Sequence, residues 1–344
     1  MPDLKSIVQQ EISQKGPYSF ARFMELALYH PELGYYCKAA RQDDYYTNAD
    51  VHAVFGDILA RFLAAHGAET IVELGAGEGK LCRLILKALQ TDFPEIHKKC
   101  SYVCVEKSPA RRQACAEAGK DFPGKITVKE NFDFGPGSIN GVILSNEFFD
   151  ALPFHRAYLE LGAVKEVQIG KDFEEILAPA SKEVREYFDW LNVFPQEGAY
   201  AEVQIACRDW MGKIGRAMKK GVVLSIDYGF ETRELFSEAR PLGTALCHFK
   251  HSTNREYYER IGDQDITAHV NFSVLMKEGE KQGLKPTLMS QSRFILNNGF
   301  EEAVKKLENV ADPRARLRLS SAIKSLVHPE SMGGAFKVLL QKMA

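Results

Sequence analysis

Two acids and an amide follow a hydrophobic run in the segment "LSNEFFDALP". Asn146, Glu147 and Asp150 come directly after "INGVILS", which has the composition of a buried strand. Polar groups beside such a strand cost free energy unless they are hydrogen-bonded or serve a function. If the turn is helical, Glu147 and Asp150 lie three residues apart on one face. Two carboxylates there could grip a cationic group such as a guanidinium and aim its nitrogen. The alternative is a helix cap with both acids exposed.

The other side chains of this segment have supporting roles. Asn146 can orient a cofactor or an acceptor. Phe148 and Phe149 can exclude water, although one of them serves equally well as a core residue. We therefore predict Glu147, Asp150 and Asn146 as the catalytic residues.

A glycine-rich loop, "IVELGAGEGK", stands between a predicted strand and a predicted helix. Gly75, Gly77 and Gly79 permit a tight turn and let a ligand approach the backbone at a helix N-terminus. Dinucleotide loops have the spacing G-x-G-x-x-G. The spacing here, E-x-G-x-G-x-G, is typical of S-adenosyl-L-methionine methyltransferases, in which the loop wraps the amino-acid end of the cofactor. We expect Ala76 in the same contact, and Glu73 suits the cationic end of the cofactor electrostatically.

Two further strand ends supply polar groups for a nucleoside. The next strand, "SYVCVE", ends at Glu106, where an acid can accept hydrogen bonds from both ribose hydroxyls. The third strand ends at "KENFDFGPG". Glu130 or Asn131 could bond the adenine amino group there, and Phe132 could pack on the ring. An ordinary polar turn is the alternative for these three residues.

Residues outside the core of the site are predicted to border the acceptor. Tyr35, Tyr36 and Thr47 belong to an N-terminal segment that we expect to cover the cofactor as a lid. The tyrosines could flank a cationic acceptor, or they could anchor the N-terminal helices on the core. Asp227 and Tyr228 end the fifth strand. Asp227 is either a further carboxylate or, as we favour slightly, a turn former before a glycine.

The elements that must position these residues alternate between strands and helices. From "TIVELG" to "GVILSN" the pattern is βαβαββ, which predicts a doubly wound, mainly parallel, Rossmann-like α/β sheet. The predicted segments are an N-terminal helical lid (1–66), a cofactor-binding core (67–155 and 201–230), a β-rich insertion (156–200) and a C-terminal substrate-side excursion with the final strands (231–344).

Composition limits the partners. The formal charge of −2 gives no general attraction to nucleic acid, so none is expected. No segment is long and apolar enough to span a bilayer. The 7 cysteines are scattered without a C-x-x-C pair, and His248 and His251 lack ligands at suitable spacing, so we predict no metal. Reduced cysteines and the absence of a targeting signature at the start predict a cytoplasmic protein.

The motifs together resemble the MidA-like methyltransferases, whose mitochondrial members act on arginine in a subunit of respiratory complex I. The resemblance covers nearly the whole chain, and its most specific strings are "NEFFDALP" and "HPELGYY". It implies a class I methyltransferase fold that uses S-adenosyl-L-methionine and releases S-adenosyl-L-homocysteine. The chain departs from the family at Ala76 and Glu78, where Pro and Arg are common, at "DYYTNAD", which lacks a proline, and at Asn271 in place of Asp.

The leading hypothesis is therefore N-methylation of arginine in a protein. A second hypothesis keeps the cofactor but has a small-molecule acceptor. A third is a catalytically idle assembly factor, against which the retained glycines and acids argue. The number of methyl groups transferred and the oligomeric state do not follow from the sequence.

Overall fold

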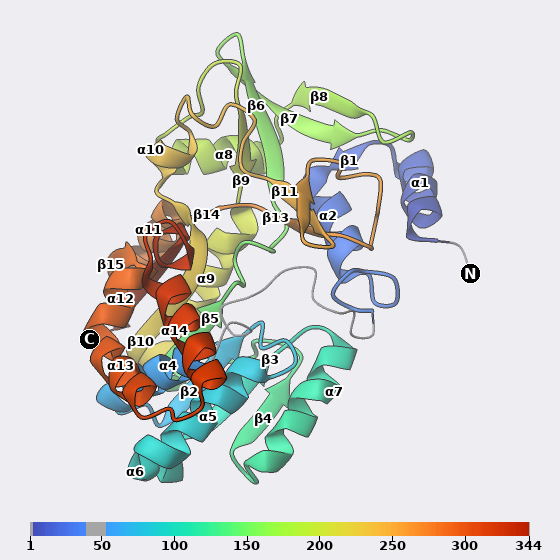
Figure 1. Cartoon of the computed structure of the whole chain (residues 1–344). Coiled ribbons are helices and arrows are strands. Elements are labelled where there is room, and N and C mark those ends of the chain that lie inside the picture. The colour runs from blue at the N-terminus through green and yellow to red at the C-terminus, as the bar shows by residue number, and fades with distance from the viewer. Residues whose placement is uncertain (1–2, 39–52, 344) are drawn as a thin grey trace. The chain divides into compact units, whose positions relative to one another are not determined.

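The computed structural model describes residues 3–38 and 53–343, and the chain forms two compact units (Figure 1). Unit 1 is built from residues up to 45, 149–211 and 229–278, and unit 2 from residues 46–148, 212–228 and 279–344. Three elements have residues in both units: α9 (Ile205–Ala217), β10 (Met218–Phe230) and α11 (Phe272–Lys281).

An eight-stranded sheet has seven of its strands in the order β15-β16-β10-β5-β2-β3-β4, and these form the centre of unit 2. In chain order they are β2 (Thr70–Leu74), β3 (Ser101–Val105), β4 (Ile126–Lys129), β5 (Ile139–Asn146), β10, β15 (Lys285–Ser290) and β16 (Phe336–Met343). From β4 to β10 all neighbours are parallel, whereas β16 is antiparallel to both β10 and β15. This is the predicted doubly wound sheet, and β16, the last strand of the chain, lies antiparallel between β10 and β15.

Helices cover this sheet because the apolar faces of the helices and of the sheet are buried against each other. Parallel strands enclosed by helices are apolar on both faces, and four of the five residues of β2 are buried. Helix α4 packs against α5, α12, α13 and α14, and α7 packs against β4. The helices are α4 (Ala53–Ala65), α5 (Lys80–Asp92), α6 (Pro94–Lys99), α7 (Pro109–Ala118), the short 3₁₀ helix η1 (Gly119–Asp121), α12 (Gln291–Asn298), α13 (Phe300–Glu308), α14 (Pro313–Val327) and α15 (Met332–Ala335).

Unit 1 is built on an antiparallel sheet in the order β1-β7-β6-β9, with β8 paired to β7. Its strands are β1 (Tyr18–Ser19), β6 (His155–Glu160), β7 (Ala163–Ile169), β8 (Glu175–Pro179) and β9 (Tyr200–Val203). A smaller sheet contains β11 (Leu246–Phe249), β12 (Ser252–Asn254) and β13 (Asp265–Thr267), while β14 (Val270–Asn271) pairs with the end of β10. The helices are α1 (Leu4–Lys15), α2 (Phe20–Tyr29), α8 (Lys182–Leu191) and α10 (Thr232–Leu235).

The structure divides the predicted N-terminal segment 1–66, because α1 and α2 belong to unit 1 and α4 belongs to unit 2. The role of this segment as a lid stays a prediction. The predicted insertion, residues 156–200, holds most of the unit 1 sheet together with α8. None of the helices in residues 3–38 and 53–343 has the length and apolarity that crossing a membrane requires.

Candidate functional site

The glycine loop joins β2 to α5 with three backbone positions that favour glycine. Gly75, Gly77 and Gly79 have φ values of 66°, 55° and 78°, a region that side chains with a Cβ rarely occupy. A Cβ on Gly77 would meet no atom within 4 Å, so this residue borders open space. By contrast, a Cβ on Gly75 would lie 2.9 Å from Cδ2 of Phe148. The loop is therefore open at Gly77 and packed at Gly75.

Glu106 is fixed against this loop by backbone donors. Its Oε2 accepts a hydrogen bond from the Gly77 amide at 2.9 Å, and its Oε1 accepts one from the Ser108 amide at 2.8 Å. The residue follows β3 directly and is 7% exposed. Each carboxylate oxygen can accept more than one hydrogen bond, so capacity remains for hydroxyl donors such as those of a ribose. The carboxylate is thus oriented before any ligand arrives.

Glu73 does not face outward as a charged group. It is 3% exposed, and its Oε2 accepts a hydrogen bond from the Tyr102 hydroxyl at 2.8 Å. Burial raises the pKa of its carboxyl to about 8, because the charged form loses its hydration. The Tyr102 hydrogen bond opposes that rise. The predicted role of Glu73 as a negative charge for the cofactor is not supported by this placement, since the strand directs its carboxyl into the core.

Cysteines that are scattered in the sequence meet beside Glu73. One ligand atom each from Glu73, Cys82 and Cys104 lies within 4.8 Å of the others, and all three residues are buried. The surrounding core is apolar, which favours neutral thiols over thiolates. We interpret the cluster as packing, and the absence of a metal role stays a prediction. Sequence spacing could not reveal this cluster because its residues come from three different elements.

The residues predicted for adenine follow β4, where Arg112 organises the chain. Arg112 donates to the Glu106 carbonyl oxygen at 3.1 Å, and its Nη2 lies 3.1 Å from an oxygen of Glu130. The Phe132 ring lies 4.9 Å from that of Phe134, and Asn131 is exposed. Sequence reasoning missed Arg112, which connects the ends of β3 and β4; its position in a polar helix gave no distinguishing signal. The adenine roles of Glu130, Asn131 and Phe132 stay predictions.

The segment after β5 makes a strained turn rather than a helix. Glu147 has a φ of 51°, which is uncommon for a residue with a side chain. Its amide donates to the Ile226 carbonyl oxygen at 2.9 Å, and its Oε1 accepts a hydrogen bond from Asn146 Nδ2 at 3.0 Å. Such strained positions persist only where surrounding contacts impose them, and they cluster at functional sites. Glu147 is half-buried, so its carboxylate is both oriented and accessible.

Asp227 supplies one of the contacts that impose this turn. It is 1% exposed, and its Oδ2 accepts a hydrogen bond from the Phe148 amide at 3.2 Å. The interpretation of Asp227 as a turn former is wrong, because β10 continues to Phe230 and Asp227 pairs with Lys337 of β16. The ring of Tyr228, also predicted at the site, packs edge-on against Phe336 at 5.7 Å.

The prediction that Glu147 and Asp150 share a helical face is also wrong. Residues 147–152 contain no helix, and the boundary between the two units falls after Phe148. Asp150 is 1% exposed in unit 1, where its carbonyl oxygen accepts a hydrogen bond from the Ala268 amide at 3.1 Å. Phe149 is 1% exposed and belongs to the core. Burial therefore removes Asp150 from the exposed carboxylates, and the catalytic roles of Asn146, Glu147 and Asp150 stay predictions.

The N-terminal tyrosines are anchored within unit 1. The Tyr36 hydroxyl donates to both carboxylate oxygens of Asp265, at 2.7 and 2.9 Å, and its ring lies 5.1 Å from that of Tyr35. Both rings pack against a buried cluster that includes α1 and α2. These contacts match the anchoring alternative. Thr47, predicted with the tyrosines, lies outside the described residues.

Comparison with known proteins identifies the class of reaction that this chain catalyses. A profile of the family described as "Putative S-adenosyl-L-methionine-dependent methyltransferase" matches residues 55–289, more than half of the chain. The chain belongs to this family. A crystal structure of a Burkholderia thailandensis protein bound to S-adenosyl-homocysteine is 28% identical to it, with a TM-score of 0.86, over 99% of this chain and 92% of that one. A native crystal structure from the same organism has a TM-score of 0.85.

Curated relatives agree over nearly the full length of this methyltransferase. A zebrafish (Danio rerio) protein named "Protein arginine methyltransferase NDUFAF7, mitochondrial" is 26% identical over 97% of this chain and 86% of its own length. The human protein of the same name is 24% identical over 95% of this chain and 80% of its own length. These names contradict the predicted cytoplasmic location, which rested only on reduced cysteines and an unremarkable start. That prediction is wrong.

The protein is thus an S-adenosyl-L-methionine-dependent methyltransferase of the predicted class I fold, and the resemblance found in its motifs is confirmed. The residues present fit the cofactor. Gly77 leaves open space at the loop, and Glu106 presents a fixed carboxylate suited to hydroxyl groups.

The openness of Gly77 leads to a first prediction. A Gly77→Val variant should lose at least about a hundredfold in affinity for S-adenosyl-L-homocysteine, because a branched side chain would occupy the space that the loop leaves for the ligand. Calorimetric titration measures this. Gly124→Val is the matched control, since Gly124 also has a positive φ, of 74°, and open space around it. The control should bind normally, and equal affinity in the two folded variants would contradict the loop assignment.

The burial of Glu73 leads to a second prediction. Its pKa of about 8 exceeds the ordinary 4.5, so the folded state keeps a proton that the unfolded state releases. The tighter binding of this proton in the folded state stabilises the fold. Its contribution to the free energy of unfolding is complete below pH ~4.5 and is lost as the pH rises toward 8. Glu73→Gln carries no titrating group at this position. Its free energy of unfolding relative to that of the wild type should therefore rise between pH 5.5 and 7.5, by at most about 1.4 kcal/mol per pH unit.

Chemical denaturation of both proteins at several pH values measures this difference. The control is Glu69→Gln, because Glu69 is exposed one residue before β2, and it reports what the same replacement does at the surface. A Glu73→Gln effect that is the same at all pH values would show that the Glu73 carboxyl ionises normally in the folded protein.

Proposed function

We propose that this methyltransferase transfers the methyl group to a nitrogen of an arginine side chain in a protein. The observation that supports this most strongly is the half-buried carboxylate of Glu147, fixed at the carboxyl end of β5 beside the glycine loop. The printed names of the curated relatives, protein arginine methyltransferases, point to the same acceptor.

A guanidinium needs a carboxylate of this kind. It is positively charged at any physiological pH, and a nitrogen that accepts a methyl group must present electron density toward it. A carboxylate that binds the other N–H groups draws positive charge to them and orients the attacking nitrogen. Glu147 can do this because Asn146 holds one of its oxygens at 3.0 Å. The carboxylate so held is half-buried and can accept hydrogen bonds from the N–H groups of an acceptor.

The cofactor, when bound, supplies an activated methyl group and leaves as S-adenosyl-L-homocysteine. The residues of the chain bind the cofactor and align the acceptor with its methyl group. We assign the ribose hydroxyls to Glu106 and the amino-acid end to the loop from Gly75 to Gly79. The Phe148 ring, which packs on Gly75, fixes the distance between the loop and Glu147. Alignment of this kind accounts for much of the catalysis in a displacement reaction.

This arrangement differs from the pair of carboxylates expected from the sequence. At this turn we assign the acceptor to one carboxylate, that of Glu147. Asp227 stabilises the turn because its Oδ2 accepts a hydrogen bond from the Phe148 amide. The strain at Glu147 is then part of the mechanism, since it turns the side chain away from the path it would follow in an extended strand.

Replacing Glu147 by Gln tests the function. The variant keeps the shape and one acceptor oxygen but loses the charge, so turnover should fall by about two to three orders of magnitude. Affinity for S-adenosyl-L-homocysteine should stay nearly unchanged. The measurement is methylarginine recovered by mass spectrometry from host lysate protein treated with enzyme and isotope-labelled S-adenosyl-L-methionine.

The exposed-site variant Glu69→Gln serves as the control and should label protein as the wild type does. Protein labelling by Glu147→Gln within a few-fold of wild type would remove the role of Glu147 as the guanidinium partner. Label found only in small molecules would instead favour a metabolite as the acceptor.

A further inference from the structure

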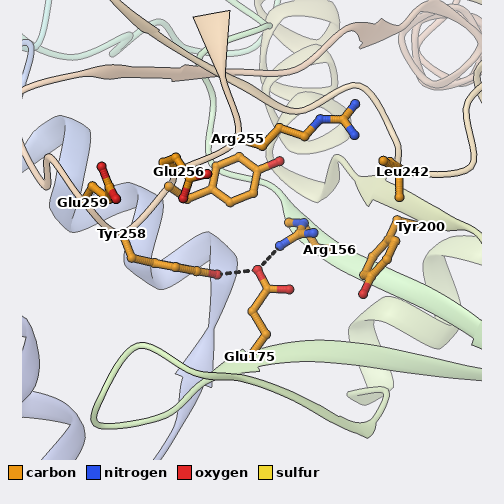
Figure 2. A pocket seen from close by; sticks show the side chains of 9 residues that line it. Arg156, Glu175, Tyr200, Leu242, Arg255, Glu256, Tyr258 and Glu259 are labelled. Atoms are coloured by element: carbon orange, nitrogen blue, oxygen red, sulfur yellow. Dashed lines mark hydrogen bonds and ion pairs between the residues drawn. The ribbon is translucent and has the colours of Figure 1, made fainter.

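A cavity of about 350 Å³ lies within unit 1. None of the residues that line it belongs to the glycine loop, which is part of unit 2. Figure 2 shows Arg156 of β6 at the centre of the cavity, with Tyr200 of β9 on one side and Tyr258 on the other. Leu242 and Arg255 come from the two loops that complete the wall. The volume suits a small organic group or one amino-acid side chain.

Arg156 is held rigidly among aromatic rings. Its guanidinium carbon lies 5.2, 5.0 and 4.9 Å from the ring centres of Phe20, Tyr200 and Tyr257. Its Nη1 donates to Oε1 of Glu175, and the residue is only 7% exposed. A side chain so enclosed has lost its conformational freedom before a ligand binds, which lowers the cost of binding.

The guanidinium retains unused donors. Within the part of the chain that the structure describes, its hydrogen bonding is limited to Nη1, so Nε and Nη2 have no protein acceptor. Neither nitrogen is among the fully buried side-chain atoms that lack a partner, and Arg156 lines the cavity, so the cavity is where an acceptor can reach these donors. Nε and an Nη together form the planar fork that matches a carboxylate.

A second guanidinium reaches the same cavity. Arg255 is exposed, and its Nη2 donates to the carbonyl oxygen of Gly243 at 3.2 Å. The loop that bears Gly243 is itself fixed, because Glu202 accepts hydrogen bonds from the Thr244 and Ala245 amides at 2.8 and 3.0 Å. The backbone around the cavity is therefore held in place on this side.

Nearby acids limit the charge that the cavity can accept. Glu175 forms an ion pair with Arg156 and accepts a hydrogen bond from the Tyr258 hydroxyl at 2.7 Å (Figure 2). Glu259 lies 3.6 Å from Arg260. Among the lining residues this leaves one negative charge, on Glu256, and one positive charge, on Arg255. The cavity therefore has no surplus positive charge for a ligand with two negative charges, whereas a single carboxylate can use the Arg156 fork.

We propose that this cavity binds a monocarboxylate carried on a small apolar body. The carboxylate accepts from Nε and Nη2 of Arg156, with Arg255 adding attraction from the rim. The apolar body packs against Leu242 and the rings of Tyr200 and Tyr257. The group belongs either to a free organic acid or to the carboxyl terminus of a chain. The site does not depend on the identity of the methyl acceptor.

Calorimetric titration of the full chain with N-acetyl-L-leucine and with N-acetyl-L-leucinamide tests the site. The two probes have the same body, but the second lacks the carboxylate, so it should bind at least about tenfold more weakly. Arg156→Lys keeps the charge but loses the fork and should weaken the acid about tenfold. Arg255→Gln, at an exposed position that should not disturb folding, should weaken it about threefold. The control is Arg233→Gln, on the exposed face of α10, which should change nothing.

The source of the carboxylate is decided with the tetrapeptide Gly-Gly-Ala-Leu and its amidated form. Tighter binding of the free-carboxyl peptide than of N-acetyl-L-leucine indicates a chain terminus, and equal or weaker binding indicates a free acid. Equal affinity for N-acetyl-L-leucine and its amide, no binding of either, or an unchanged affinity in the folded Arg255→Gln and Arg156→Lys variants would overturn the proposal.

Discussion

The hydrogen bond from the Gly77 amide to the Glu106 carboxylate joins the two strand ends on which the cofactor site depends. Gly77 follows the central strand β2 and Glu106 follows its neighbour β3, so the bond fixes one loop against the other at the carboxyl edge of the sheet. A carboxylate that accepts hydrogen bonds from two backbone amides is held in one orientation. The same contact therefore shapes the loop and prepares the group that we assign to the ribose.

The turn at Glu147, to which we assign the acceptor, is attached to this arrangement from the other side of β2. Strand β5 pairs with β2 and with β10, and the chain turns at Glu147 just where β5 ends. Asp227 of β10 holds the Phe148 amide, and the Phe148 ring packs on Gly75. The ends of β2, β3, β5 and β10 are thus connected by short polar and van der Waals contacts. A displacement reaction needs this, since small errors in alignment reduce its rate greatly.

Sequence patterns predicted the sheet and the loop well because both depend on local rules. Strand–helix alternation fixes a doubly wound topology, and glycine spacing fixes where a ligand can approach. The direction of individual side chains depended on tertiary contacts instead. Glu73 enters the core because its strand position places it beside Tyr102, and Asp150 is buried because the turn after Glu147 is not helical. The cavity around Arg156 combines five separate segments, which no local pattern connects.

The most direct test of the account measures whether Glu106 holds the ribose of the cofactor. Calorimetric titration would compare S-adenosyl-L-homocysteine with its 2′-deoxy analogue, in the wild type and in Glu106→Gln. The wild type should bind the 2′-deoxy analogue about tenfold more weakly than S-adenosyl-L-homocysteine, because the analogue lacks one of the two ribose hydroxyls. The variant should bind the parent compound at least about tenfold more weakly and lose little more with the analogue, because coupled partners are not additive. An equal loss in both proteins, or a variant that binds the parent compound as the wild type does, would contradict the proposed site.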